Sequence, residues 1–187
     1  MKKRTSEYPK NVFKGAIKLA SYLCDPLVFE FRDNGLNEEQ IRNLDFLIEK
    51  HLYEREQKIF NLRFKENKLL KEISGEVDLS ISAVSIIIQE ILYKVILNPM
   101  NIKYIYSGKF TKNPNPTSNI IKNDNVYDLD ISKLGISDPI IRNLNRNNIF
   151  TIGELKKVII NGDIYDIKCV SIKSATIILC EMYNAGL

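Results

Sequence analysis

The sequence predicts an all-α protein made of two small helical domains joined by a linker. Apolar residues recur at helical spacing from about residue 10 to residue 97, and again from residue 127 to the end. Residues 107–125 are instead rich in asparagine, contain two prolines and lack apolar periodicity, which is typical of a linker. No convincing pair of strands is present. These patterns divide the chain into residues 1–36, 37–97, 98–127 and 128–187.

Residues 1–36 are expected to form a basic tail and an accessory helix. The tail, residues 1–9, opens with Met1-Lys2-Lys3-Arg4. Apolar residues at helical spacing then predict a helix over residues 10–24, and Asp25-Pro26 ends it. The following residues are expected to be irregular, and this pattern assigns no role to the region.

A second helix is expected to begin after Asn37. Gln40 lies three residues further on, so the two side chains can form a capping box. The apolar side of this helix consists of Ile41, Leu44, Leu47 and Ile48. His51, which is the single histidine, lies at its end. We interpret it as a complement to the helix C-terminal charge or as a bystander, not as a catalyst.

Residues 54–95 have the pattern of helix, helix, tight turn and helix, which indicates a helix-turn-helix. Such a unit places its last helix in the major groove of DNA. Ser80 is the expected N-cap of that helix, which runs from Ile81 to Val95. A helical wheel predicts a core face of Ile81, Val84, Ile87, Ile88, Ile91, Leu92 and Val95. It predicts an outward face of Ser82, Ser85, Ile86, Gln89 and Tyr93.

Residues 52–95 resemble region 4 of bacterial sigma-70-type factors. The shared residues are Arg55-Glu56, Ile59, Leu62-Arg63-Phe64, Leu70, Glu72-Ile73, Ser80, Val84, Ile87, Leu92 and Lys94. The resemblance implies a domain whose last helix reads the −35 promoter element and which also docks on the flap of RNA polymerase. By resemblance, the DNA-binding residues are the cap Ser80 and the groove-facing Ser82, Ala83, Ser85, Ile86 and Gln89.

The groove-facing positions differ from that family in charge. They are neutral here, where the family usually has several arginine, lysine, glutamate or glutamine residues. Gln89 can still read adenine, the serines can reach bases or phosphate, and Ile86 can meet a thymine methyl group. Charge is expected instead from the preceding helices, at Arg63, Lys65, Lys68 and Lys71. Asp78 takes a turn position where glycine is common, and a carboxylate facing DNA there would repel phosphate.

Helical spacing resumes after residue 127 in shorter pieces. Ser137 with Pro139, and Thr151 with Glu154, have the chemistry of helix starts. The helix after Thr151 is expected to end at Asn161-Gly162. A turn of helix near residues 164–167 and a last helix, which carries apolar residues from Ile172 to Met182 and closes at Gly186, complete the expected domain.

Residues 128–187 resemble the C-terminal domain of the bacterial RNA polymerase alpha subunit. The shared residues are Leu134-Gly135-Ile136-Ser137, Arg142-Asn143-Leu144, Asn148-Ile149, Thr151-Ile152-Gly153-Glu154-Leu155 and Val170-Ser171-Ile172-Lys173-Ser174. The resemblance implies a compact helical fold with a helix-hairpin-helix. That family binds the minor groove of AT-rich upstream DNA and contacts transcription factors.

Within that resemblance, Lys173 and Ser174 match the pair that contacts phosphate. Arg142 lies near the other DNA-facing helix of the family. Pro139 takes the position of the principal DNA-contacting arginine, so that contact is missing here. Cys169 and Ser171 flank Val170 in the hairpin turn, and Ser171 replaces the usual glycine.

Composition limits the other function classes. The formal charge of +4 permits a DNA partner without requiring one. Cys24, Cys169 and Cys180 have no metal-ligand spacing, and their odd count argues against a disulfide framework, which favours a cytoplasmic chain with reduced thiols. No signal peptide or membrane-spanning run is expected. We expect no catalytic residues, cofactor or metal, because no carboxylate cluster, nucleophile–histidine set or phosphate-binding glycine loop is present.

Together the two resemblances predict a transcription-associated protein, either a regulator or an accessory factor of RNA polymerase. Its partner would be double-stranded DNA, AT-rich or in a promoter, bound in the major groove by the first domain. The second domain would bind the minor groove or the polymerase. The alternative is an adaptor that binds RNA polymerase or a sigma factor without DNA, which the neutral groove face and Pro139 favour. The target sequence, activation or repression, and the oligomeric state stay open.

Overall fold

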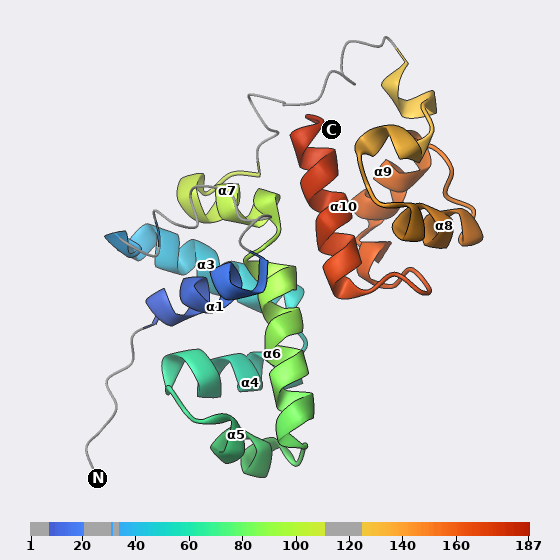
Figure 1. The fold of residues 1–187 in the computed structure, drawn as a ribbon. Coiled ribbons are helices and arrows are strands. Elements are labelled where there is room, and N and C mark those ends of the chain that lie inside the picture. The colour runs from blue at the N-terminus through green and yellow to red at the C-terminus, as the bar shows by residue number, and fades with distance from the viewer. Residues whose placement is uncertain (1–7, 21–30, 32–33, 111–124) are drawn as a thin grey trace. The chain divides into compact units, whose positions relative to one another are not determined.

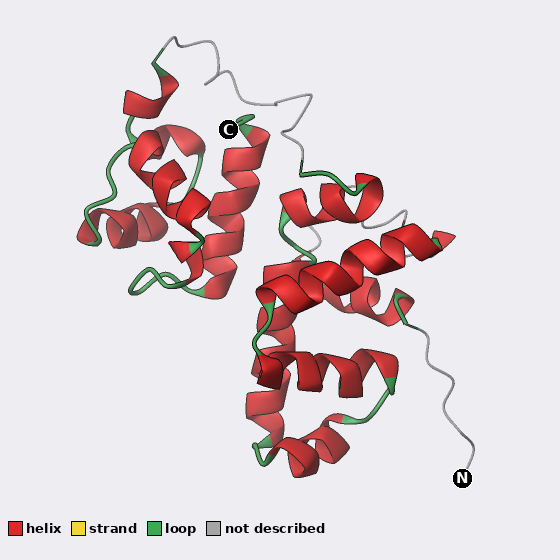
Figure 2. Cartoon of the chain, turned by 180° about the vertical axis from the view of Figure 1, so that it is seen from behind, coloured by secondary structure: helices red, strands yellow, loops and turns green. Residues whose placement is uncertain are grey.

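The all-α prediction is confirmed by the computed structural model, which describes residues 8–20, 31, 34–110 and 125–187 (Figure 1). In this part of the chain the regular structure is helical, apart from one isolated β-bridge between Asp130 and Thr151 (Figure 2). The chain forms two compact units, unit 1 over Met1–Phe110 and unit 2 over Thr111–Leu187.

Unit 1 is built around one long helix, α6, which spans Ile81–Val95. Helices α1, α3, α4 and α5 all pack on it. Val84, Ile91 and Val95 on its inner side are fully buried. The bounds of the other elements are α1 Lys10–Ala20, α3 Glu38–His51, α4 Glu54–Phe60, α5 Leu70–Val77 and α7 Pro99–Ser107, with a π-helical turn, η1, at Asn61–Lys65.

The start of α3 follows the predicted capping chemistry. The Asn37 side chain accepts a hydrogen bond from the Gln40 amide at 2.9 Å, and the Gln40 side chain accepts one from the Asn37 amide at 3.0 Å. Each bond satisfies an amide that has no partner inside the helix. Leu44, Leu47 and Ile48 are buried as expected, whereas Ile41 is only half-buried.

Helix α7 occupies residues that the sequence pattern assigned to the linker. Asn98 caps it, with its side-chain oxygen 3.0 Å from the Met100 amide, and Pro99 lies in its first turn. An asparagine–proline pair can end one helix or begin another, and here it begins α7. Ile102 and Ile105 are buried, and α7 packs against α3. In the structure, unit 1 therefore continues to Phe110.

Unit 2 is a cluster of short helices around an apolar core. Its elements are η3 Val126–Asp128, η4 Ile131–Leu134, α8 Asp138–Arg146, α9 Ile152–Asn161, η5 Asp163–Tyr165 and α10 Ile172–Asn184. Leu144, Ile152, Leu155 and Ile178 are fully buried in that core. The capping box at Thr151 is confirmed, and hydrogen bonds from the Phe150 and Thr151 amides lower the pKa of Glu154.

Within the described ranges, no single helix is both long and apolar enough to cross a membrane. Helices α6 and α7 reach the necessary length and apolarity only as a pair, and that pair is bent by 65° at the break between them.

Candidate nucleic-acid interface

The turn between α5 and α6 has the geometry of a helix-turn-helix. Helix α5 ends at Val77, and its C-cap residue Asp78 adopts the left-handed conformation with φ of 52°. Glycine favours this conformation, and aspartate is one of the few other residues that adopt it without large cost. Ser80 then caps α6, because its hydroxyl oxygen accepts a hydrogen bond from the Ala83 amide at 3.1 Å. The Leu79 amide closes the turn on the Ser74 carbonyl at 3.2 Å.

The outward face of α6 carries most of the predicted groove-facing residues. Ser82, Ile86 and Gln89 are exposed, and Ala83 and Ser85 are half-buried. We call Ser82, Ala83, Ser85, Ile86 and Gln89 the recognition face. The structure thus leaves these side chains accessible to a partner, while the buried side of α6 holds the helix in place.

Two residues of α6 lie on the opposite side from their prediction. Ile81 was expected in the core, but its side chain is 48% exposed, because it precedes the first buried turn of the helix. Tyr93 was expected on the outward face, but it is buried, and its hydroxyl donates a hydrogen bond to the Leu19 carbonyl at 3.5 Å. Helix α1 covers this part of α6, which a wheel drawn for α6 alone does not include.

The surface formed by α5 and α6 is poor in positive charge. Residues 70–95 contain two lysines, Lys71 and Lys94, against the acids Glu72, Glu76, Asp78 and Glu90. Lys94 is largely buried and pairs with Glu56 at 2.6 Å, so it is not available to phosphate. Lys71, by contrast, is exposed at the start of α5. The two helices alone therefore attract the DNA backbone weakly.

Three of the four cations expected to supply charge are engaged within unit 1. The Lys65 ammonium lies 2.9 Å from an Asp45 oxygen. The Arg63 guanidinium donates a hydrogen bond to the Lys68 carbonyl at 2.8 Å. The Lys68 ammonium lies 2.7 Å from a Glu76 oxygen and 3.0 Å from a Glu66 oxygen, and these bonds raise its pKa. Two carboxylates thus compensate Lys68. We expect little phosphate binding from it unless DNA displaces those partners.

Helix α4 fixes the end of α5 through its own cations. Arg55 donates a hydrogen bond to the Val77 carbonyl and Lys58 donates one to the Glu76 carbonyl, each at 3.2 Å. The last carbonyls of a helix have no partner inside it and carry partial negative charge, so these contacts are favourable. They hold α5 at a fixed angle to α4, and so they set the position of the turn that precedes α6.

Comparison with known proteins identifies this part of unit 1. Residues 50–95 match the family model of Sigma-70, region 4. This segment is a sigma-70 region 4-like helix-turn-helix. The match supports the resemblance proposed from the sequence, and it indicates a DNA-binding helix-turn-helix related to transcription. No curated protein and no solved structure matches the chain.

The region 4 segment covers about a quarter of the chain, and among the described residues unit 1 also contains helices α1, α3 and α7. Helices α1 and α3 precede the matched residues, except for the end of α3, and α7 follows them. The sequence pattern of α6 gives no sign that α1 packs on it. Gly15 allows this approach, because a Cβ atom at that position would lie 3.0 Å from a methyl carbon of Leu92.

In unit 2, the predicted contact residues lie near the turn that precedes α10. Ser171 caps α10, with its hydroxyl oxygen accepting a hydrogen bond from the Ser174 amide at 3.1 Å. Lys173 is exposed and Ser174 is half-buried. Cys169 is exposed and adopts a positive φ of 64°, in a turn where a helix-hairpin-helix would need a residue that tolerates this conformation.

Helix α8 is tied to the same turn by two side-chain amides. Asn143 donates a hydrogen bond to the Cys169 carbonyl at 2.7 Å, and Asn147 donates one to the Lys168 carbonyl at 2.9 Å. Arg142 is exposed on α8, and Pro139 is exposed in its first turn. The arrangement is compatible with the alpha-subunit resemblance, which stays a prediction.

The described residues contain no group of three or more histidine, cysteine, aspartate or glutamate side chains that could hold a metal ion. Cys24 lies outside the described residues. Of the described cysteines, Cys169 is exposed and Cys180 is buried.

Proposed function

We propose that this chain is a transcription-associated protein that binds duplex DNA with the recognition face of α6. The observation that supports this proposal most directly is the exposure of Ser82, Ile86 and Gln89 on the last helix of a region 4 segment. Gln89 would pair with adenine, the serines would bond to base edges or phosphate, and Ile86 would contact thymine methyl groups. These chemistries favour AT-rich sites.

We further propose that unit 2 supplies a second, weaker contact. Lys173 and the capped start of α10 would meet a phosphate at the minor groove, as the alpha-subunit resemblance implies. Arg142 would add charge from α8. Two weak contacts on one chain raise the overall affinity, because the linker keeps the second unit at high effective concentration once the first has bound.

A second candidate function is an adaptor that binds RNA polymerase or a sigma factor without contacting DNA. The neutral recognition face favours it, and so do the exposed Ile81 and Ile86, since an apolar surface is common in protein contacts. Loss of the DNA-contacting arginine at the Pro139 position points the same way.

Salt-dependent binding separates the two functions. The full chain would be titrated against AT-rich duplex by fluorescence anisotropy from about 50 to 200 mM salt, where each phosphate contact contributes a slope of roughly 0.9 in log K against log salt. A negative slope supports DNA binding. Absence of binding at the lowest salt concentration, together with nuclease-resistant capture of RNA polymerase subunits from lysate, would leave the adaptor as the better description.

A further inference from the structure

The proposed DNA contact by α6 needs a source of positive charge that the region 4 segment does not provide. The recognition face carries no cation, and the acids of α5 and α6 outnumber their lysines. Helix α1 has the opposite character: it carries Lys10, Lys14 and Lys18 and no acid. This helix lies outside the residues matched by the family model.

A cavity of about 310 Å³ lies where α1 meets α6 and the π-helical turn η1. Its apolar lining comes from Gly15, Phe64, Ile88 and Leu92. Among the residues that the structure describes, its polar lining comes from Asn11, Lys14, Arg63 and Asn67, and none of these described lining residues is an acid. Two cations and two amides around one cavity form an environment suited to an anion. We call this the α1 cavity.

The α1 cavity borders the recognition face. Leu92 forms part of its lining, and Ser85 lies seven residues earlier on the same helix. Seven residues of an α-helix amount to nearly two full turns, so the two side chains point only about 20° apart around α6 and lie roughly 10 Å apart along it. An anion in the cavity would therefore lie beside a partner bound along Ser85 and Gln89.

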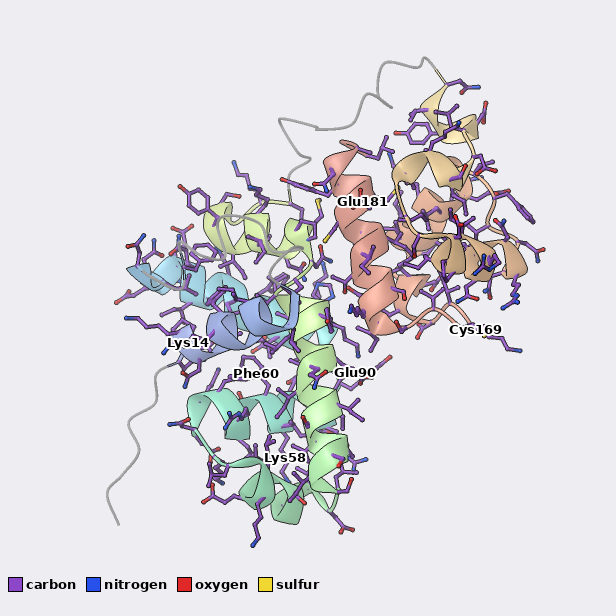
Figure 3. The ribbon with its side chains drawn as sticks, viewed as in Figure 1. Lys14, Lys58, Phe60, Glu90, Cys169 and Glu181 are labelled. Carbon is purple, nitrogen blue, oxygen red and sulfur yellow. The ribbon has the colours of Figure 1, made fainter. Side chains whose placement is uncertain are left out.

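Helix α1 is held firmly enough to present such a site. Val12, Phe13 and Ala16 are fully buried against the rest of unit 1. Just before the helix, the Tyr8 hydroxyl donates a hydrogen bond to Asp45 at 2.8 Å. Lys14, labelled near α1 in Figure 3, is exposed and also lines the cavity.

We infer that the α1 cavity binds a backbone phosphate of the DNA whose major groove α6 enters. In this arrangement Lys14 supplies the charge and Asn11 and Asn67 supply polar groups. The guanidinium of Arg63 faces the same phosphate while it retains its hydrogen bond to the Lys68 carbonyl. Arginine has five donors, so both interactions are compatible. The accessory helix thereby replaces the charge that the recognition face lacks. This inference rests on the proposed function.

The test compares two lysines of one helix. Lys14→Gln removes charge from the cavity, and Lys10→Gln removes the same charge one turn earlier, where the side chain packs near Gly35. Duplex binding by the full chain is measured from about 50 to 200 mM salt for both variants, for wild type and for Lys14→Arg. Loss of one phosphate contact lowers the magnitude of the salt slope by roughly 0.9 and weakens binding about eightfold at 0.1 M salt.

We expect this loss for Lys14→Gln only, equally on all duplex sequences, with recovery in Lys14→Arg. Equal slopes for Lys14→Gln and Lys10→Gln, with DNA binding otherwise intact, overturn the phosphate site but leave the proposed function standing. Absence of duplex binding by wild type overturns both.

Binding of inorganic phosphate tests whether the cavity holds a free phosphate ligand and not a DNA phosphate. If calorimetry shows that it binds in a Lys14-dependent way while the DNA salt slope is unchanged by Lys14→Gln, the cavity belongs to a free phosphate ligand, and the inferred DNA contact is wrong.

Discussion

Replacing Ile86 by alanine tests whether the recognition face contacts thymine methyl groups. The substitution removes three carbon atoms, each worth about 0.8 kcal/mol when transferred from water to an apolar contact, or about 2.4 kcal/mol in all. In the free protein 55% of the side chain is exposed, and only that part remains to be buried on binding. The expected loss of binding free energy is therefore about 1.3 kcal/mol, or roughly tenfold in Kd.

The assay measures Kd by anisotropy on a duplex selected from a randomised pool, made once with thymine and once with uracil, which lacks the methyl group. Each contacted methyl group is worth up to about 0.8 kcal/mol, so uracil should weaken wild-type binding by up to about fourfold. It should not weaken Ile86→Ala further, because the partner of the methyl group is then gone. The salt slope should be the same for both proteins, since no charge changes.

Ile160 provides the matched control. It is 71% exposed on α9, a helix that carries none of the predicted DNA-contacting residues, so Ile160→Ala should leave Kd unchanged. An uracil penalty of the same size in wild type and Ile86→Ala would refute the methyl contact. An unchanged Kd in Ile86→Ala would refute the orientation of α6 in the groove.

Four further outcomes are expected. Gln89→Ala should reduce discrimination between duplex sequences more than affinity, as measured by competition; unchanged discrimination would argue against groove reading by α6. Lys173→Glu should weaken the DNA contact of unit 2, and an unaltered isotherm would show that its hairpin turn faces elsewhere. Glu56→Gln leaves the largely buried Lys94 without its carboxylate and should destabilise unit 1 by about 3 kcal/mol. Urea denaturation followed by hydrogen exchange measures this loss. The double variant that also carries Lys94→Met should regain the lost stability. Burial, and secondarily the charge of Lys50, lower the pKa of His51 below its ordinary value. The unfolded chain therefore binds the proton more readily than the folded chain, so unit 1 should lose stability as pH falls below about 6.5. The His51→Gln variant should show a weaker dependence of stability on pH.

Helix starts could be predicted from the sequence because their chemistry is local. Asn37 with Gln40, and Thr151 with Glu154, satisfy their own amides across three residues, and both capping boxes form as expected. Ser80 caps α6 for the same reason. The recognition face followed from the same periodicity, since Ser82, Ile86 and Gln89 lie opposite the buried side of one helix.

The remaining features depend on contacts between segments distant in sequence. Tyr93 is buried because α1 covers it, and nothing in the pattern of α6 shows that α1 lies there. Leu62 and Phe64 of the π-helical turn η1 are two residues apart and both buried, because more than one helix packs around this turn. The α1 cavity likewise depends on the close approach of α1 and α6. In the sequence, only the small residue Gly15 indicates that such an approach is possible.

The packing of helix α7 determines the C-terminal boundary of a stable fragment of unit 1. A fragment stopped at Leu97 would lose Ile102 and Ile105, both buried, and would expose the side of α3 that they cover. It would also deprive the Asn43 amide of its carbonyl acceptors at Tyr104 and Ile105. A fragment extended through Phe110 keeps those contacts and the stacking of Phe110 on Tyr104. Of the two fragments, this one is therefore better suited to crystallisation or NMR.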